Sequence, residues 1–186
     1  MNGGRGIMKP VILFIAASLD GYIADEKGNI DWLTKAEGKG DNGYDEMYRR
    51  VDTVIMGRKT YEHVLLLMEF FPYSGKDCYV FSTSRTGSDR HVSFVQGDVA
   101  EWIQNKQQES GSGIWIVGGT DIIAPLLEAE MIDEYIITFT PDLLGHGTPL
   151  FKPRAGQPKR LYLHEVKALG ELAQLHYKRS DGLERH

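Results

Sequence analysis

The chain has 186 residues, of which 41% are hydrophobic and 25% charged, and its formal net charge is −5. This length suffices for one compact domain with a substantial core, and the composition is that of an ordinary globular protein. The negative charge argues against broad attraction to nucleic acid or to an anionic membrane surface, so we expect neither as a partner.

The single cysteine, Cys78, excludes an intramolecular disulfide and a metal site built from several cysteines. It lies beside an apolar run, which favours a buried structural thiol over a reactive one. The six histidines show no metal-ligand spacing, so we expect no metal. No apolar run approaches the roughly 20 residues of a membrane helix, and this chemistry fits a reducing, cytoplasmic compartment.

The two ends of the chain are set apart from the fold. We expect residues 1–8 to be a disordered or vector-derived tail, and residues 180–186 to be a tail left from a purification tag. Residues 9–179 are then expected to form a single domain.

The first element expected in chain order is a continuous apolar run over 9–17, which suits a central strand buried on both faces. A polar, glycine-rich loop over 35–43 precedes a short helix over 44–50. The elements expected after these are a strand over 52–56, a helix over 59–68, strands over 78–83 and 91–95, a helix over 98–107, a strand over 114–117, a helix over 121–128, a strand over 132–140, a long loop over 141–158, and strands over 160–166 and 171–178.

Local signals refine two of the helices. Asp98 is the expected N-cap of the helix that follows it, and Pro125 is expected to be tolerated only near the first turn of its helix. Because buried strands alternate with helices, the sequence predicts an α/β fold with a mainly parallel central sheet. The last two strands predict an antiparallel edge hairpin around Gly170.

Three predicted strands end in loops that could hold a ligand: Gly57–Thr60, Ser82–Arg85 and Gly118–Asp121. Ligands of open α/β sheets bind outside the carboxyl ends of the strands. Two of these loops open a helix, where free N–H groups and the helix dipole favour phosphate. Each loop alone could be an ordinary turn, but the three together predict a ligand with more than one phosphate, such as a dinucleotide.

Several common site signatures are absent from the sequence. It contains no Gly-x-Gly-x-x-Gly after a first strand, no P-loop and no Gly-x-Ser-x-Gly motif. The usual Rossmann fingerprint, a P-loop nucleotidase and a serine hydrolase of the α/β type are therefore not indicated. His146, between two glycines, is expected to be a loop residue.

At this point the motifs resemble a known family. Val54–Glu62 resembles the strand-and-helix signature of dihydrofolate reductases, Phe81–Arg85 their next strand end, and Ile116–Ile122 their Gly-Gly turn, whose peptide bond is cis. The resemblance covers roughly residues 10–177. It implies a dihydrofolate-reductase-like three-layer αβα fold and NADPH as the cofactor.

Other segments are similar to the reductase domain of bacterial riboflavin biosynthesis, the RibD C-terminal type, and especially to its free-standing relatives. These segments are Ala17–Ala24, Ile30–Leu33 and Gly145–Phe151. The riboflavin enzyme often carries a zinc deaminase domain as well, which needs several cysteines. Because this chain has one cysteine, the resemblance implies the reductive step alone.

The resemblance also implies which residues bind the cofactor. Arg58 and Thr60 would contact its phosphates, and Ser82, Ser84 and Arg85 would hold the 2′-phosphate of NADPH. The full implied set is Ala16, Ile23, Gly57, Arg58, Lys59, Thr60, Ser82, Thr83, Ser84, Arg85, Val117, Gly118, Gly119, Thr120, Asp121 and Ile122.

The catalytic residues are less sharply indicated. Trp32 falls where the family has a loop over the active site, and Asp45, or a water that it orients, is the expected proton source. Asp41 is a second candidate on the same segment, and Asp31 and Asp20 are candidates on the cofactor side. A cap or turn role is the alternative for each of these acids.

The expected activity is hydride transfer from NADPH to a heterocyclic substrate, most closely of the 5-amino-6-(5-phosphoribosylamino)uracil reductase type. A dihydrofolate or pterin reductase, a non-catalytic nucleotide-binding module and a sugar-phosphate enzyme are the alternatives. The resemblance also implies a homodimer. The apolar run Leu65–Phe71 is expected to line the pocket or an interface, or to belong to the core.

Overall fold

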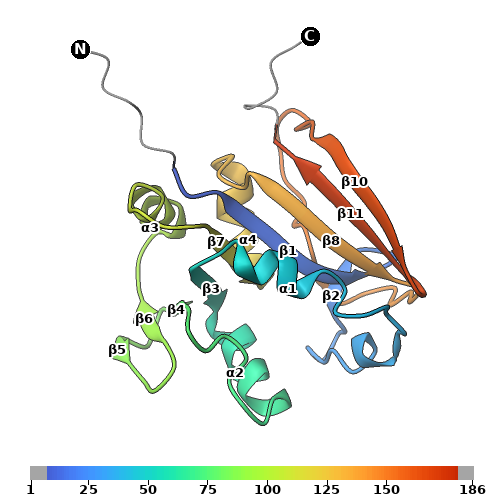
Figure 1. Ribbon diagram of the computed structural model, residues 1–186, viewed down its shortest axis with the longest axis horizontal. Helices are drawn as coiled ribbons and strands as arrows, with labels where there is room; N and C mark the ends of the chain where they lie inside the picture. Colours follow the sequence, from blue (N-terminus) through green and yellow to red (C-terminus); the bar gives the residue numbers. More distant parts are fainter. Residues whose placement is uncertain (1–7, 180–186) are drawn as a thin grey trace.

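The computed structural model describes residues 8–179 (Figure 1). The tails expected at 1–8 and 180–186 lie, except for Met8, outside the described residues. The helices are the 3-10 helix η1 (Leu33–Lys35), α1 (Tyr44–Arg49), α2 (Arg58–Leu67), α3 (Val99–Lys106) and α4 (Thr120–Glu128). The strands are β1 (Val11–Ser18), β2 (Tyr22–Ala24), β3 (Thr53–Gly57), β4 (Asp77–Phe81), β5 (Gly87–Ser88), β6 (Ser93–Val95), β7 (Ile114–Gly118), β8 (Glu134–Thr140), β9 (Thr148–Pro149), β10 (Tyr162–Leu169) and β11 (Leu172–Lys178).

Nine of the strands form one sheet in the order β10-β11-β8-β1-β7-β3-β4-β6-β5. Neighbouring strands from β8 to β6 in this order pair in parallel. The hairpin β10–β11 joins β8 in antiparallel orientation, and Figure 1 shows it forming one side of the sheet. The predicted mainly parallel sheet with an antiparallel C-terminal edge hairpin is therefore confirmed.

Helices cover both faces of this sheet. Ile12 and Leu13 are neighbours in β1, yet they belong to two different apolar clusters because side chains alternate along a strand. The cluster with Ile12 includes Met47 of α1 and Tyr61 of α2. The cluster with Leu13 includes side chains of α3 and α4. These two clusters make the protein a three-layer αβα fold, as predicted.

The observed helix α4 differs from the expectation for its proline. Pro125 is the sixth residue of α4, well past the first turn. A proline there removes one helical hydrogen bond at a cost of about 3 kcal/mol. Ile122, Ile123 and Leu126 on the same helix are buried against the sheet. Burying three such side chains contributes about 1.5–3 kcal/mol each, which outweighs that cost.

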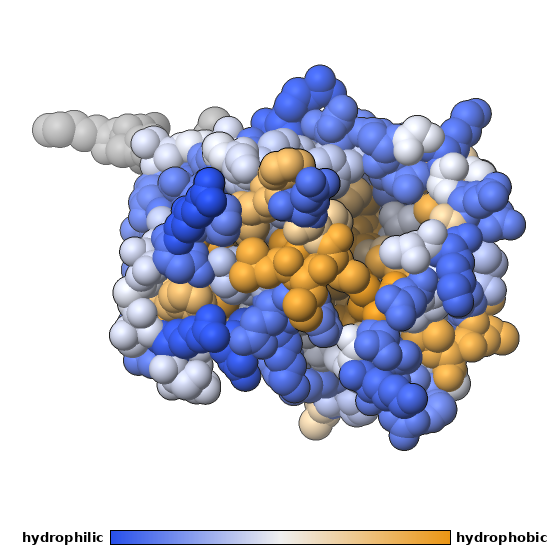
Figure 2. Space-filling view, turned by 90° about the horizontal axis from the view of Figure 1, so that it is seen from below, coloured by the Kyte–Doolittle hydropathy of each residue, from blue (hydrophilic) through white to orange (hydrophobic). Residues whose placement is uncertain are grey.

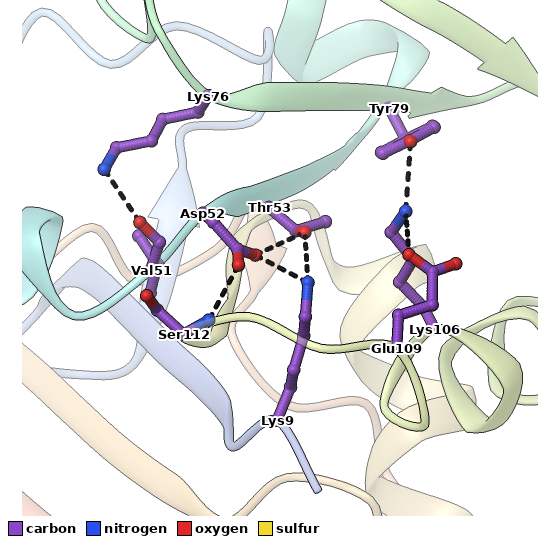
Figure 3. Close-up of polar contacts among 9 residues, drawn as sticks. All are labelled: Lys9, Val51, Asp52, Thr53, Lys76, Tyr79, Lys106, Glu109 and Ser112. Atoms are coloured by element: carbon purple, nitrogen blue, oxygen red, sulfur yellow. Dashed lines mark hydrogen bonds and ion pairs between the residues drawn. The ribbon is translucent and has the colours of Figure 1, made fainter.

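A cluster of charged and polar side chains lies at the amino-terminal ends of β1, β3 and β7 (Figure 3). Lys9 is 4% exposed, and its Nζ donates to Asp52 Oδ1 at 2.8 Å. The other Asp52 oxygen accepts the Ser112 N–H at 2.7 Å. A Cβ added at Gly111 would lie 2.0 Å from this Asp52 carboxylate. Because Gly111 has no side chain, the Lys9–Asp52 ion pair can occupy this space.

The apolar run Leu65–Phe71, which spans the end of α2, is mostly exposed. The expectation that it belongs to the core is therefore wrong for most of its length. Figure 2 shows apolar residues gathered in the middle of one face of the molecule. The exposed apolar side chains of this segment are Leu65, Leu66, Leu67, Met68 and Phe70. Phe71 turns inward and packs edge-on against Tyr61 and Tyr73. The expectation that the exposed part lines a pocket or an interface stays a prediction.

Cys78 is buried, and burial raises the pKa of its thiol to about 12. This confirms the structural interpretation of the cysteine. None of the helices within residues 8–179 combines the length and the apolar character that crossing a membrane requires.

Candidate active site

The three ligand loops expected from the sequence follow β3, β4 and β7, which are neighbours in the sheet. Because these strands are parallel, their carboxyl ends lie at the same edge. The fold therefore brings the three loops together at one end of the sheet, next to the end of β1. This is the arrangement in which open α/β sheets bind ligands.

The central strand β1 parts from its neighbour β7 at this edge. The two strands pair only from Val11 to Leu13, whereas β1 stays paired with β8 as far as Ser18. Beyond the last pair, the Phe14 carbonyl accepts a hydrogen bond from the Trp115 indole at 3.0 Å. The carboxyl half of β1 is thus bounded by a strand on one side only.

The same stretch of β1 is less covered than the rest of the strand. Val11, Ile12 and Leu13 are fully buried, but Phe14, Ile15 and Ala16 are only half-buried, although β1 lies in the middle of a nine-stranded sheet. Val117, at the end of β7, is half-buried as well. These half-buried residues of the central sheet form a surface on which a flat ring could pack.

Gly57 and Gly119, which precede α2 and α4, bring the starts of these two helices close together. A Cβ at Gly57 would lie 3.8 Å from the Gly119 nitrogen and 3.5 Å from Ile122 Cγ1. A Cβ at Gly119 would lie 3.6 Å from Thr60 Oγ1 and 3.9 Å from Ile23 Cδ1. Five residues of the expected cofactor set, from four different elements, therefore lie close together.

The Gly118–Gly119 peptide bond is cis, as the resemblance implies. Gly118 has a φ of +130°, and a Cβ there would be 3.3 Å from the Ile15 side chain. Only glycine adopts this backbone conformation without strain. Gly118, at the end of β7, thus lies near Ile15, in the half of β1 that is not paired with β7.

Two side chains expected to contact the cofactor are engaged with the protein instead. The Thr120 hydroxyl donates to the Pro149 carbonyl of β9, and the Asp121 carboxylate pairs with Lys152 at 2.6 Å. Both contacts tie the start of α4 to the segment 148–152. At this helix start, main-chain N–H groups are what remains for an anion.

The loop after β4 is organised around Ser82. Its side chain is buried, and its Oγ accepts the N–H groups of Ser84 at 3.3 Å and Arg85 at 3.1 Å. Thr83, Ser84 and Arg85 are exposed. Ser82 therefore shapes the turn, and the other three present their side chains to solvent.

An acidic residue that sequence reasoning missed lies between the two expected phosphate-binding arginines. Glu62 Oε1 is 2.7 Å from Arg58 Nη1 and 3.8 Å from Arg85 Nη2. The spacing of four residues from Arg58 on a predicted helix was the signal that could have found it. The convergence with Arg85 could not be read from the sequence.

Trp32 immediately precedes η1, which packs against β1. Its side chain is 9% exposed, and among residues 8–179 no partner receives its buried indole N–H. Such a group costs free energy unless something accepts its hydrogen bond. Trp32 thus offers a hydrogen-bond donor next to a helix that contacts β1.

The acidic candidates have different surroundings. Asp45 is exposed in the first turn of α1, and Asp31 is exposed before η1. Asp41 accepts the N–H groups of Asp45 at 2.7 Å and Gly43 at 3.1 Å, which places it as a cap ahead of α1. These hydrogen bonds, that from Asp45 first, hold the pKa of Asp41 below its ordinary value.

Asp20 serves as a loop clamp. It accepts hydrogen bonds from the Ser18 hydroxyl at 2.7 Å, the Gly145 N–H at 2.7 Å and the Leu144 N–H at 3.1 Å. These bonds, led by the one from Ser18, lower the pKa of Asp20. The cap-or-turn alternative weighed for this residue is therefore what the geometry supports.

The sequence also gave no hint of Gln174 in β11. This buried side chain donates to Thr138 Oγ1 at 2.9 Å and to the Asn42 carbonyl at 3.0 Å. It joins the C-terminal hairpin to the segment that leads into α1.

Comparison with known proteins finds matches over nearly the whole chain. The family model for the RibD C-terminal domain matches residues 9–70 and 73–175. An uncharacterized protein of Bacillus subtilis strain 168, YwjB, is 47% identical over 173 residues, which are 92% of this chain and 99% of that protein.

Solved structures agree with this family match. A putative riboflavin biosynthesis protein from Shewanella sp. PV-4 has a TM-score of 0.81 and 34% identity, covering 92% of this chain and 99% of that one. A diaminohydroxyphosphoribosylaminopyrimidine deaminase/5-amino-6-(5-phosphoribosylamino)uracil reductase from Thermotoga maritima has a TM-score of 0.70 and 17% identity, covering 93% of this chain and 57% of that one. Dihydrofolate reductase from Enterococcus faecalis has a TM-score of 0.62 and 16% identity, covering 92% and 97%. The last two share the fold, which confirms it as dihydrofolate-reductase-like.

Proposed function

The chain belongs to the RibD C-terminal domain family, and from this premise we propose that it is an NADPH-dependent reductase of a heterocyclic substrate. The observation that carries the proposal is the meeting of Gly57 and Gly119 beside the uncovered end of β1. Two helix starts there face the same space, as a pyrophosphate requires. An uncovered stretch of sheet adjoins them, as a nicotinamide ring requires.

The residues present fit the proposed cofactor. Side chains at Gly57 or Gly119 would enter the space between the two helix starts, so their absence keeps that space open. Arg58, Lys59 and Arg85 supply positive charge at the same edge, where Arg is well suited to bind phosphate. When bound, the cofactor would supply the hydride, and the protein would hold the two rings in contact and exclude water.

The substrate would lie between the uncovered end of β1, Trp32 and the start of α1. The Trp32 indole N–H lacks an acceptor among the described residues and would donate to a polar atom of the substrate. A heterocycle with ring nitrogens and carbonyl oxygens provides such an acceptor. The half-buried apolar side chains Phe14 and Ala16 would pack against its ring face.

We propose Asp45 as the proton source, acting directly or through a water. Asp20 and Asp41 are poor proton sources, because several hydrogen bonds stabilise their ionised forms, lower their pKa and leave little protonated carboxyl to donate. Among residues 8–179, no such network of N–H groups donates to Asp45 or Asp31, and both residues are exposed. Of the two, Asp45 lies on α1, whose Tyr44 packs against Trp115 of β7.

The substrate class proposed is an aminouracil that carries a phosphorylated sugar chain, as in 5-amino-6-(5-phosphoribosylamino)uracil. This choice is supported by the family and by the Shewanella relative, whose name refers to riboflavin biosynthesis. The alternative is a dihydrofolate or other pterin, for which the shared fold is the supporting observation.

The proposal is tested by titrating the protein with NADPH and with NADH, followed by turnover assays with the aminouracil substrate and with dihydrofolate. We expect tighter binding of NADPH and oxidation of NADPH that depends on the aminouracil. Turnover with dihydrofolate alone would favour the pterin alternative. Binding without turnover of any substrate would favour a nucleotide-binding module, and a lack of NADPH binding would refute the proposal.

We also propose a homodimer, in keeping with the resemblance to the riboflavin-type reductases. Its supporting observation is β10, an eight-residue strand at the edge of the sheet. Tyr162, Leu163 and Val166 on this strand are exposed. An apolar edge strand with unpaired main-chain groups is suited to pair with a second copy.

A further inference from the structure

Glu62 is the only acidic residue of α2, and it stands between two cations from different elements. Arg58 begins the helix, and Arg85 lies in the loop after β4. The Glu62 carboxylate is 2.7 Å from the first guanidinium and 3.8 Å from the second. All three side chains are between 37% and 51% exposed, so an incoming ligand can reach them.

The position of these charges is unfavourable for the helix itself. The first turn of α2 contains no acidic residue and begins with Arg58 and Lys59. Cations at a helix start oppose the helix dipole, which favours negative charge there. The Arg–Glu order along the helix is also the weaker one for an ion pair four residues apart. Helix stability therefore does not explain why the arginine is there.

An anionic ligand at this helix start does explain it. Arg58 and Arg85 approach the same point in space, and in the free protein a carboxylate of the protein is at that point. Arg85 is not hydrogen-bonded to Glu62, because 3.8 Å is longer than a hydrogen bond, and its guanidinium rests over the Phe94 ring. Its donors can thus turn toward a stronger anion.

We infer that Glu62 is a specificity-determining residue, an internal counter-ion that holds the place of the cofactor's 2′-phosphate between Arg58 and Arg85. This inference rests on the proposed function. Binding of a 2′-phosphate requires the carboxylate to release both guanidinium groups, or to remain beside a dianion that repels it. Either event lowers the affinity for NADPH and leaves the affinity for NADH unaffected. Glu62 therefore limits how strongly the site prefers NADPH.

The test compares Glu62→Gln with the unaltered protein in equilibrium titrations with NADPH and with NADH. The two cofactors differ only in the 2′-phosphate, so their affinity ratio isolates that group. Removing the carboxylate charge is expected to raise the NADPH-to-NADH affinity ratio by roughly two- to five-fold, the scale of an exposed ion pair. The gain should shrink at high salt, because exposed charges are screened.

The matched control is Glu69→Gln, which removes the same charge from an exposed residue just beyond the end of α2. It should leave the affinity ratio unchanged. A thermal unfolding curve for each variant checks that the fold is retained, and Glu62→Ala provides a second variant that removes the carboxylate.

The outcomes separate the inference from the proposed function. A higher ratio for both Glu62 variants supports the inference. An unchanged ratio overturns the inference. A lower ratio also overturns it and assigns Glu62 the role of orienting the two arginines for binding. If the unaltered protein binds neither cofactor, the proposed function fails and the inference fails with it.

Discussion

Gly111 shows how a single missing side chain can protect a buried charge. Its φ is +148°, and an added Cβ would lie 2.0 Å from the Asp52 carboxylate and 2.5 Å from Lys9 Cε. Gly111→Ala should therefore lower the free energy of unfolding by about 2–4 kcal/mol, through backbone strain and displacement of the Lys9–Asp52 pair. Urea denaturation monitored by tryptophan fluorescence measures this change.

The control for Gly111 is Gly97→Ala. Gly97 also has a positive φ, of +103°, but nothing lies within 4 Å of an added Cβ. This variant should show the strain alone, about 1 kcal/mol. Equal losses for the two variants would mean that the contact with the ion pair is unimportant.

Glu134 gives the protein a pH dependence of known sign. Burial raises the pKa of this carboxyl, but hydrogen bonds from His176 at 2.8 Å and from Arg50 prevail and lower it from 4.5 to about 2. A group whose folded pKa is lowered stabilises the protein above its unfolded pKa. That stabilisation should be fully present above pH 4.5 and should be lost as the pH falls toward 2.

This dependence is measured by chemical denaturation at several values between pH 6 and pH 2, with Glu134→Gln as the comparison. The unaltered protein should lose roughly 1–3 kcal/mol more than the variant over this window. The variant should also be less stable at pH 6, because Arg50 and His176 lose their charged partner. Parallel curves for the two proteins would show that another carboxyl is responsible.

At the scale of elements, Asp20 joins the turn after β1 to the loop before β9. Its carboxylate accepts the N–H groups of Leu144 and Gly145 from a segment more than 120 residues away in the chain. That loop continues into Pro149, which receives the Thr120 hydroxyl at the start of α4. Asp20 therefore helps to hold the loop against the candidate cofactor site.

Asp20→Ala should release this loop while leaving the sheet intact. We expect the amides of Leu144 and Gly145 to exchange their hydrogens at least ten-fold faster, since about 1.4 kcal/mol of local stability corresponds to ten-fold. NADPH should bind more weakly, with little change in global stability. Asp25→Ala is the control, because Asp25 clamps only its own turn through Lys27 and Asn29. Unchanged exchange in the Asp20 variant would contradict its role as a clamp.

The elements that carried strong local signals could be predicted from the sequence. The apolar runs of β1, β3, β7 and β8 predicted buried strands because parallel strands are covered on both faces. Gly57 and Gly118–Gly119 marked where these strands end. The short pair β2–β9 could not be predicted, since two or three residues are too few to show an alternating pattern.

The candidate site was predictable only in part, for a physical reason. Its glycine and arginine positions lie in motifs of a few consecutive residues, which a sequence displays directly. The counter-ion Glu62, the clamp Asp20 and the polar Gln174 each act through partners far along the chain. Whether a helix end is covered is likewise decided by packing, which is why the exposure of Leu66 on α2 was not foreseen.

On the scale of the whole molecule, two apolar surfaces compete as the place where a second copy would dock. One is β10 at the edge of the sheet, and the other is the end of α2. Val166→Lys, which adds a charge to β10, should convert the proposed dimer to a monomer. Size-exclusion chromatography with light scattering gives the mass in solution.

Leu66→Lys is the matched variant on the other surface, where Leu66 is 81% exposed. It should leave the dimer intact. A monomer produced by this variant and not by Val166→Lys would move the interface to α2. A monomeric unaltered protein would refute the homodimer altogether.

The parting of β1 from β7 has a consequence for how this protein can diverge. Beyond Leu13, the main-chain groups of β1 that point toward β7 have no strand opposite them. The Phe14 carbonyl is already bonded to the Trp115 indole, so in the proposed site the groups after it would be the ones available to a ligand. Such contacts would belong to the main chain and would persist whatever side chains mutation places on the strand. Side chains of the surrounding loops could then change over evolutionary time and alter which molecule is accepted, without erasing this surface.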